Sequence, residues 1–135
     1  MKGDVTSTLH ANGRVNFPSK LREGLGDSFV IAKGLDVPCI QVYSLAAWER
    51  FEENLLEKNH PLDAEQLLRF MSKRNEEIDK QGRFFVPEHL REYAGLSKEV
   101  VFNTVGKKVE IWSKEAWDSN MSEMNVKSLL GKIVF

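Results

Sequence analysis

The sequence has a single cysteine, no long apolar run and almost no net charge. The single cysteine, Cys39, excludes a disulfide within the chain and fits a reducing compartment. No apolar run approaches the roughly 20 residues that a membrane-spanning helix needs. The N-terminal residues Met1-Lys2-Gly3-Asp4 lack the apolar segment of a secretion signal. These absences predict a cytoplasmic protein that does not contact a membrane.

Patterns typical of catalysis and of metal binding are also missing. His10, His60 and His89 are scattered and form no cluster with cysteines or carboxylates at metal-ligand spacing. The sequence shows no nucleophile paired with a base and no glycine-rich phosphate loop. Cys39 stands in an apolar, strand-like run and is expected to be buried. We therefore expect no enzymatic activity, no cofactor, no metal ion and no small-molecule substrate.

The net charge is only −1, but the charges are unevenly distributed. Residues 10–22 include Arg14, Lys20 and Arg22 and no acid, whereas residues 49–77 carry eight acids and five bases. A local basic surface can bind a polyanion even when the whole chain is nearly neutral. The charge distribution therefore leaves nucleic-acid binding open.

One stretch, residues 79–91, organises the sequence, and it occurs twice. Shifting the chain by 69 positions aligns it with residues 10–22. The aligned identities are Gly13 with Gly82, Arg14 with Arg83, Pro18 with Pro87, Leu21 with Leu90, Arg22 with Arg91, Glu23 with Glu92, Gly26 with Gly95, Ser44 with Ser113, Ala47 with Ala116 and Trp48 with Trp117. Identity at one offset over about forty positions indicates an internal duplication. Two copies are too few for a solenoid, so we expect them to pack on each other about a pseudo-two-fold axis.

Each copy reads as a tight turn, a short apolar strand and a helix. Gly82 suits the turn because glycine tolerates a positive φ. Pro87 suits the first turn of a helix, and Gly95 suits its left-handed end. The arginine that follows the turn glycine, Arg14 or Arg83, stands where the backbone is least bulky. Each unit therefore offers fixed cations on a rigid support.

The rest of the chain alternates strands and helices. Expected strands are 5–9, 15–17, 29–33, 39–43, 76–79, 84–86, 100–104 and 108–112, and expected helices are 19–25, one after Ser44, 64–73, 87–94 and one after Ser113. The first of the two middle helices carries Leu45, Trp48, Phe51, Leu55 and Leu56 on one face, with Trp48 expected in the core, and the second is expected to bury Leu67, Leu68, Phe70 and Met71. We divide the chain into repeat 1 (residues 5–50), a helical bridge (51–75), repeat 2 (76–119) and a C-terminal tail (120–135), whose apolar end has no assigned place.

Each copy resembles the swapped-hairpin DNA-binding module of the SpoVT-AbrB superfamily, and two copies with a helical bridge resemble the MraZ family. The resemblance covers about residues 5–120 and rests on 79–83, Pro87, Leu90, Arg91, Glu92, Gly95 and Leu96, on Gly13, Arg14, Pro18, Lys20, Arg22, Glu23 and 33–36, and on 111–115 and Trp117. It implies an α+β, β-rich fold in which two intertwined repeats form a barrel-like core about a pseudo-two-fold axis, with flanking helices.

The resemblance also implies a function. The MraZ family consists of DNA-binding transcriptional regulators of the bacterial division and cell-wall gene cluster. We therefore expect a repressor, associated with the nucleoid, that binds clustered short repeats of double-stranded DNA as a ring-like homo-oligomer. The expected DNA-binding residues are Asn12, Arg14, Lys20, Arg22, Lys80, Arg83 and Arg91. Arg14 and Arg83 can fork onto guanine or onto a phosphate, and the lysines suit phosphates.

Repeat 1 departs from the family pattern at two positions. His10 stands where an aspartate is usual, and Asn12 stands where a lysine is usual. The first change removes a partner or turn-stabilising acid, and the second removes one phosphate contact per subunit. Base preference or affinity is therefore expected to differ from that of close relatives.

Several readings stay open on the sequence alone. The duplicated fold could serve as a protein-binding or antitoxin-like scaffold. Arg22 and Arg91 each precede a glutamate, so an ion pair or a subunit contact is as reasonable for them as DNA contact. Arg14 and Arg83 could also be surface charges paired with neighbours.

Overall fold

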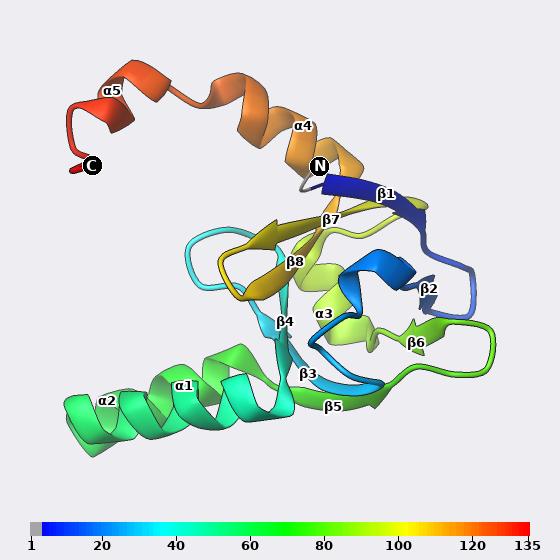
Figure 1. The fold of residues 1–135 in the computed structure, drawn as a ribbon, viewed down its shortest axis with the longest axis horizontal. Helices are drawn as coiled ribbons and strands as arrows, with labels where there is room; N and C mark the ends of the chain where they lie inside the picture. The colour runs from blue at the N-terminus through cyan, green and yellow to red at the C-terminus, as the bar shows by residue number, and fades with distance from the viewer. Residues whose placement is uncertain (1–3) are drawn as a thin grey trace.

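The computed structural model describes residues 4–135 (Figure 1). Met1–Gly3, part of the stretch read as lacking a secretion signal, lie outside the described residues. In chain order the elements are β1 (Asp4–Thr8), β2 (Arg14–Asn16), the 3-10 turn η1 (Ser19–Leu21), β3 (Ser28–Lys33), β4 (Ile40–Ser44), α1 (Leu45–Lys58), α2 (Pro61–Met71), β5 (Arg74–Glu77), β6 (Arg83–Phe85), α3 (Glu88–Ala94), β7 (Glu99–Val105), β8 (Lys108–Ser113), α4 (Lys114–Glu123) and α5 (Val126–Leu130).

The two repeats exchange their first strands. Six strands form one antiparallel sheet in the order β1-β7-β8-β4-β3-β5, and β2 and β6 form a separate two-stranded ribbon. Thus β1 pairs with β7 of the other repeat, and β5 pairs with β3 of the other repeat. The pairs β2–β6 and β4–β8 also join the repeats. Neither repeat can complete its sheet alone, which confirms the predicted α+β fold of intertwined repeats.

The register of the β2–β6 ribbon reveals the pseudo-two-fold axis. Arg14 lies opposite Phe85, Val15 opposite Phe84, and Asn16 opposite Arg83. The 69-residue offset maps the central pair onto itself and exchanges the two outer pairs. The axis therefore passes beside Val15 and Phe84, and it relates Arg14 to Arg83.

The main core lies between the ribbon and the large sheet. Phe17, Phe29, Phe84 and Phe102 come from both repeats and pack together, with ring centroids 5.0–5.5 Å apart. Such aromatic contacts add about 0.5–1.5 kcal/mol each beyond the area that they bury. Leu90 of α3 is fully buried against this cluster. The ribbon that carries the two arginines is thus fixed to the main core of the molecule.

The α1–α2 hairpin packs on the other face of β3 and projects away from the sheet (Figure 1). Side chains alternate along a strand, so Val30 and Ala32 face the hairpin while their neighbours face the main core. Trp48 and Met71 are buried at its base, as predicted. The predicted burial of Phe70 is wrong, because it is 43% exposed, and Leu45 and Leu56 on the apolar face of α1 are also more than 40% exposed. Leu56 lies on the part of the hairpin that projects beyond the sheet, whereas Leu45 and Phe70 lie at its base, where the Phe70 ring packs on Tyr93 at a centroid distance of 5.8 Å and stays partly exposed.

The predicted helix over residues 19–25 is also wrong, because the structure has only the short turn η1 there. Repeat 1 places Gly24 and Leu25 where repeat 2 places Tyr93 and Ala94. Gly24 adopts a φ of +78°, which a right-handed helix does not contain. In repeat 2 the helix continues through Ala94 and ends at Gly95, whose φ is +62°.

Two further boundaries differ from the predictions. Helix α2 begins at Pro61, three residues early, because Nδ1 of His60 accepts a hydrogen bond from the Leu62 N–H and caps the helix. Strand β5 begins at Arg74, since it must pair with β3 of the other repeat. A local side-chain cap sets the first boundary, and pairing with a distant strand sets the second.

Cys39 is buried, as predicted, in a small cluster with Val101 and Trp112. Burial, aided by the nearby Glu110 carboxylate, raises the pKa of the Cys39 thiol to about 12. Trp117 packs on the edge of Trp112, with ring centroids 5.6 Å apart. Trp117 therefore has the packing role that its amphipathic helix indicates.

The C-terminal residues extend away from the sheet as α4 and α5 (Figure 1). Leu129, Leu130 and Ile133 are each more than 40% exposed. Between Asp4 and Phe135, no helix combines the length and the apolar character that crossing a bilayer requires.

Candidate nucleic-acid interface

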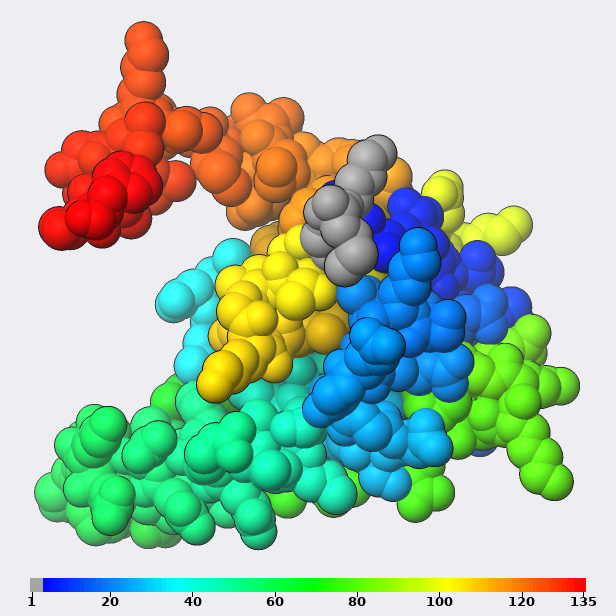
Figure 2. Space-filling model, in the orientation of Figure 1, coloured from blue at the N-terminus to red at the C-terminus, as the bar shows by residue number. Residues whose placement is uncertain are grey.

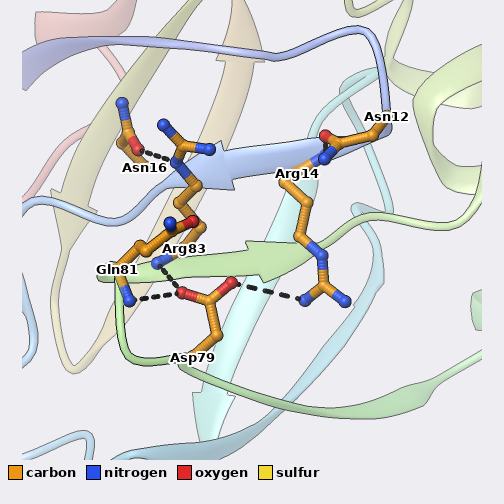
Figure 3. A network of polar contacts seen from close by, with 6 residues as sticks. All are labelled: Asn12, Arg14, Asn16, Asp79, Gln81 and Arg83. Carbon is orange, nitrogen blue, oxygen red and sulfur yellow. Dashed lines mark hydrogen bonds and ion pairs between the residues drawn. The ribbon is translucent and has the colours of Figure 1, made fainter.

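The outer face of the β2–β6 ribbon carries two arginines (Figure 3). Because side chains alternate along a strand, Val15 and Phe84 point into the core and are fully buried. Their neighbours Arg14 and Arg83 lie on the opposite face and are partly exposed. Strand alternation and the pseudo-two-fold axis together place both guanidinium groups on one surface.

Each strand of the ribbon begins directly after a tight turn, and the two turns have the same backbone. In turn 1 (residues 10–14), the Gly13 N–H donates to the His10 carbonyl, and the His10 N–H donates to the Arg14 carbonyl. Turn 2 (residues 79–83) repeats both bonds between Asp79, Gly82 and Arg83. Gly13 and Gly82 have φ values of +84° and +76°, which favour glycine.

Different side chains stabilise the two turns. In turn 2, Oδ1 of Asp79 accepts hydrogen bonds from the backbone N–H groups of Gln81 at 2.9 Å and Arg83 at 3.0 Å. In turn 1, His10 replaces this acid, and Oδ1 of Asn12 accepts from the Arg14 N–H at 3.0 Å. Asn12 thus supports the turn in addition to any contact with a ligand.

Each turn is braced by the other repeat. The carbonyl of Gly13 accepts from the Val86 N–H at 3.0 Å, and the carbonyl of Gly82 accepts from the Phe17 N–H at 2.9 Å. These two bonds are equivalent under the pseudo-two-fold axis. The turns are therefore held at fixed positions relative to each other.

Arg22 and Arg91 reach across to the turn of the other repeat. The guanidinium carbon of Arg91 lies 3.4 Å from the point where a Cβ on Gly13 would stand, and Nη2 of Arg22 lies 4.0 Å from the corresponding point on Gly82. Within residues 4–135 neither arginine forms an ion pair. Arg91 instead donates from Nε to the Val86 carbonyl at 2.9 Å, which orients its guanidinium. The structure thus gathers two arginines at each turn.

Arg14 and Arg83 have unequal surroundings. Nη1 of Arg14 lies 3.7 Å from Oδ2 of Asp79, and its guanidinium lies over the Phe85 ring at 5.8 Å. Nε of Arg83 donates to Oδ1 of Asn16 at 3.0 Å (Figure 3). The Arg14 side chain is 40% exposed, so its ion pair with Asp79 stabilises the fold little and can yield to a ligand.

The remaining predicted residues are the two lysines. Lys20 is exposed on η1, and Lys80 is exposed in turn 2. The α1–α2 hairpin, which carries much of the negative charge, projects from the opposite side of the molecule (Figure 2). The hairpin therefore does not cover the turns, whereas Glu76 and Glu77 of β5 line a pocket together with Arg14 and Asp79.

Sequence reasoning missed Asn16 as the partner of Arg83. The sequence contained a signal for this contact, because antiparallel pairing of the two duplicated strands places Asn16 directly opposite Arg83.

Across the part of the chain that the structure describes, no group of three or more histidine, cysteine or acidic side chains could hold a metal ion. Nε2 of His10 is enclosed and has no hydrogen-bond partner among residues 4–135.

Comparisons with known proteins agree with the duplication. The family model described as "MraZ protein, putative antitoxin-like" matches the chain twice, over residues 1–71 and 69–130. The transcriptional regulator MraZ of Caldanaerobacter subterraneus subsp. tengcongensis is 44% identical over 131 residues, which cover 93% of this chain and 90% of that protein. The protein of the same name from Lachnoclostridium phytofermentans is 47% identical over 122 residues, covering 87% and 84%. That from Acetivibrio thermocellus is 41% identical over 129 residues, covering 92% and 88%.

Alanine at the two turn glycines should destabilise the protein unequally. Both positions have a positive φ, which costs an L-residue about 1–2 kcal/mol. A Cβ on Gly13 would also stand 2.8 Å from Cε1 of Phe85, whereas no atom lies closer than 4.0 Å to one on Gly82. We expect Gly13→Ala to lower the free energy of unfolding by about 1–3 kcal/mol more than Gly82→Ala. Urea denaturation of both variants tests this, and equal losses would contradict the close approach of Phe85.

Asp79→Asn should destabilise the protein in a pH-dependent way. The backbone N–H of Arg83, and with it that of Gln81, holds the pKa of the Asp79 carboxyl below its ordinary value of 3.8. The folded-state pKa is lower than the unfolded one, so the carboxylate stabilises the fold at neutral pH. This contribution is lost as the pH falls through the lowered pKa. Thermal unfolding should show Asp79→Asn less stable than wild type at neutral pH, with the gap closing in acid; a gap independent of pH would contradict this account.

Proposed function

This chain belongs to the MraZ family, and on that premise we propose that it is a sequence-specific DNA-binding regulator of transcription that acts as a repressor. The relatives bear the name of a transcriptional regulator, which is consistent with a protein that is not an enzyme. The proposed target is a set of clustered short repeats in double-stranded promoter DNA of the division and cell-wall gene cluster. The proposed location is the cytoplasm, in association with the nucleoid.

The observation that carries this proposal is the pair of arginines on the outer face of the β2–β6 ribbon. Arg14 and Arg83 follow rigid turns that are hydrogen-bonded to the opposite repeat. A guanidinium can donate two hydrogen bonds to O6 and N7 of guanine in the major groove. Because the ribbon fixes the distance between the two arginines, it can select the spacing of the bases that they contact. We assign the reading of bases to these two residues.

The other cations suit the sugar-phosphate backbone. Lys20 and Lys80 are exposed, and Arg22 and Arg91 lie beside the turn glycines. Contacts with phosphates fix the position of a protein on the duplex without specifying sequence. We assign these four residues to phosphates and Asn12 to the edge of the same interface, where its side chain also supports turn 1.

Few cations per chain imply weak binding to a single site, so the proposal includes self-association. A ring-like homo-oligomer would present several ribbons to clustered repeats, and linked sites can gain about 10²–10⁴-fold in apparent affinity. Sedimentation equilibrium of the full chain should show an oligomer at micromolar concentration. A monomer that nonetheless binds an operator tightly would contradict the avidity argument.

A protein-binding or antitoxin-like scaffold is the second candidate function. The family model is itself described as antitoxin-like, and the α1–α2 hairpin exposes Leu56, Leu62 and Phe70. These apolar side chains could contact another protein on a surface that does not include the turns. The two functions differ in their response to salt, since DNA binding releases counterions and weakens steeply as salt rises.

Replacing both turn arginines by alanine should remove most DNA binding. Each bidentate contact with guanine is worth about 1–3 kcal/mol, so each substitution should weaken binding by about 5- to 150-fold. Gel shifts with a promoter duplex, repeated over a salt series, measure the effect for Arg14→Ala, Arg83→Ala and the double variant. The matched control is Arg69→Ala, because Arg69 is an exposed arginine on α2.

Two outcomes would count against the proposal. Undiminished binding in the double variant would contradict the assignment of the arginines. Absence of DNA binding by the wild type at low salt would favour the scaffold instead.

A further inference from the structure

A second surface feature lies beside turn 1. It is a pocket of about 470 Å³ whose polar lining comes from Thr8, His10, Arg91, Ser97 and Lys98. Two of these side chains are cations, two are hydroxyls, and none is a carboxylate. Leu9 and Ala11 supply the rest of the lining.

The equivalent position in repeat 2 has the opposite charge. The Leu9 N–H donates to the Lys98 carbonyl at 2.8 Å, and the Ile78 N–H donates to the Asp27 carbonyl at 2.9 Å. These two bonds are equivalent under the pseudo-two-fold axis, so Lys98 corresponds to Asp27. The duplication likewise pairs His10 with Asp79 and Thr8 with Glu77. Three carboxylates in repeat 2 thus stand where repeat 1 has a lysine, a histidine and a threonine.

This difference in charge is confined to the side chains near the two turns. The hydrogen bonds of the two turns are the same on both sides of the axis, and an arginine from the opposite repeat stands beside each turn glycine. The side chains around that arginine differ, and so does the segment that carries it, because Arg22 follows the 3-10 turn η1 and Arg91 lies in helix α3. An anion is therefore repelled by the carboxylates of repeat 2 and attracted to the corresponding site of repeat 1.

We propose that the pocket beside turn 1 binds a phosphate group. Lys98 and Arg91 supply the positive charge, and the hydroxyls of Thr8 and Ser97 donate hydrogen bonds to phosphate oxygens. Nε of Arg91 is bonded to the Val86 carbonyl, which fixes the orientation of the guanidinium that lines the pocket. Glu99 lies opposite Thr8 in the sheet but does not line the pocket.

The phosphate can come from one of two sources. Arg91 both lines the pocket and approaches Gly13, so a bound phosphate lies next to turn 1. A DNA duplex bound at the turns would bring a backbone phosphate close to this pocket, and this source rests on the proposed function. A free phosphate or the phosphate of a nucleotide has the same chemistry and does not depend on DNA binding.

The experiment uses the full chain and two variants, Lys98→Gln and Lys58→Gln. Both remove one exposed lysine, and Lys58 lies at the end of α1, outside the pocket. Inorganic phosphate is titrated at constant ionic strength while amide NMR signals are followed. DNA affinity is then measured over a salt series for the same three proteins. Neither lysine is buried, so both variants should fold.

We expect phosphate to shift the amide signals of Thr8, Ser97 and Lys98 in the wild type and in Lys58→Gln. Lys98→Gln should bind phosphate about 10-fold more weakly, since it loses a charged hydrogen bond. If DNA supplies the phosphate, the slope of log affinity against log salt should also be smaller by about one in Lys98→Gln than in the wild type. The slope of Lys58→Gln should equal that of the wild type.

The outcomes separate the sources and the proposals. Shifted amides with an unchanged salt slope identify a free phosphate as the ligand, and a changed slope identifies the DNA backbone. If the wild type binds no DNA, the proposed function fails, while the amide shifts still decide whether the pocket binds phosphate. Unmoved amides together with equal salt slopes in the two variants, or with no DNA binding at all, would overturn the inference.

Discussion

The pairing of β2 with β6 is the contact on which the rest of the structure depends. It joins the same strand of the two repeats across the pseudo-two-fold axis and buries Val15 and Phe84 beneath it. The outward-facing residues of the ribbon, Arg14 and Arg83, are therefore fixed relative to each other. The exchange of β1 and β5 between the repeats prevents either turn from moving independently. A fixed spacing of two cations is a consequence of this topology.

The two turns share a backbone but differ in charge. Asp79 supports turn 2 with two hydrogen bonds, whereas Asn12 supports turn 1 without adding a negative charge. The surroundings of turn 1 are consequently more favourable for an anion than those of turn 2. Such a difference would give the interface a direction on DNA, although the fold itself is nearly symmetric.

The duplication made much of the fold predictable from sequence. Glycine, arginine and proline at one offset of 69 residues predicted both turns, and the intertwined packing followed from the family resemblance. Long-range contacts were less predictable: the bond from Arg83 to Asn16 joins residues 67 positions apart. The prediction of a helix over 19–25 failed because Gly24 adopts a positive φ, and the predicted burial of Phe70 failed because its ring packs on Tyr93 and Lys33 yet stays 43% exposed. A local sequence pattern does not show how closely another helix or strand will pack against a side chain.

The central claim is that turns 1 and 2 face DNA. Hydrogen–deuterium exchange of the full chain, with and without a bound promoter duplex, tests this claim most directly. The account predicts slower exchange of the backbone in residues 10–14 and 79–83, with no change in the α1–α2 hairpin. Slower exchange centred on the α1–α2 hairpin, with both turns unaffected, would contradict it.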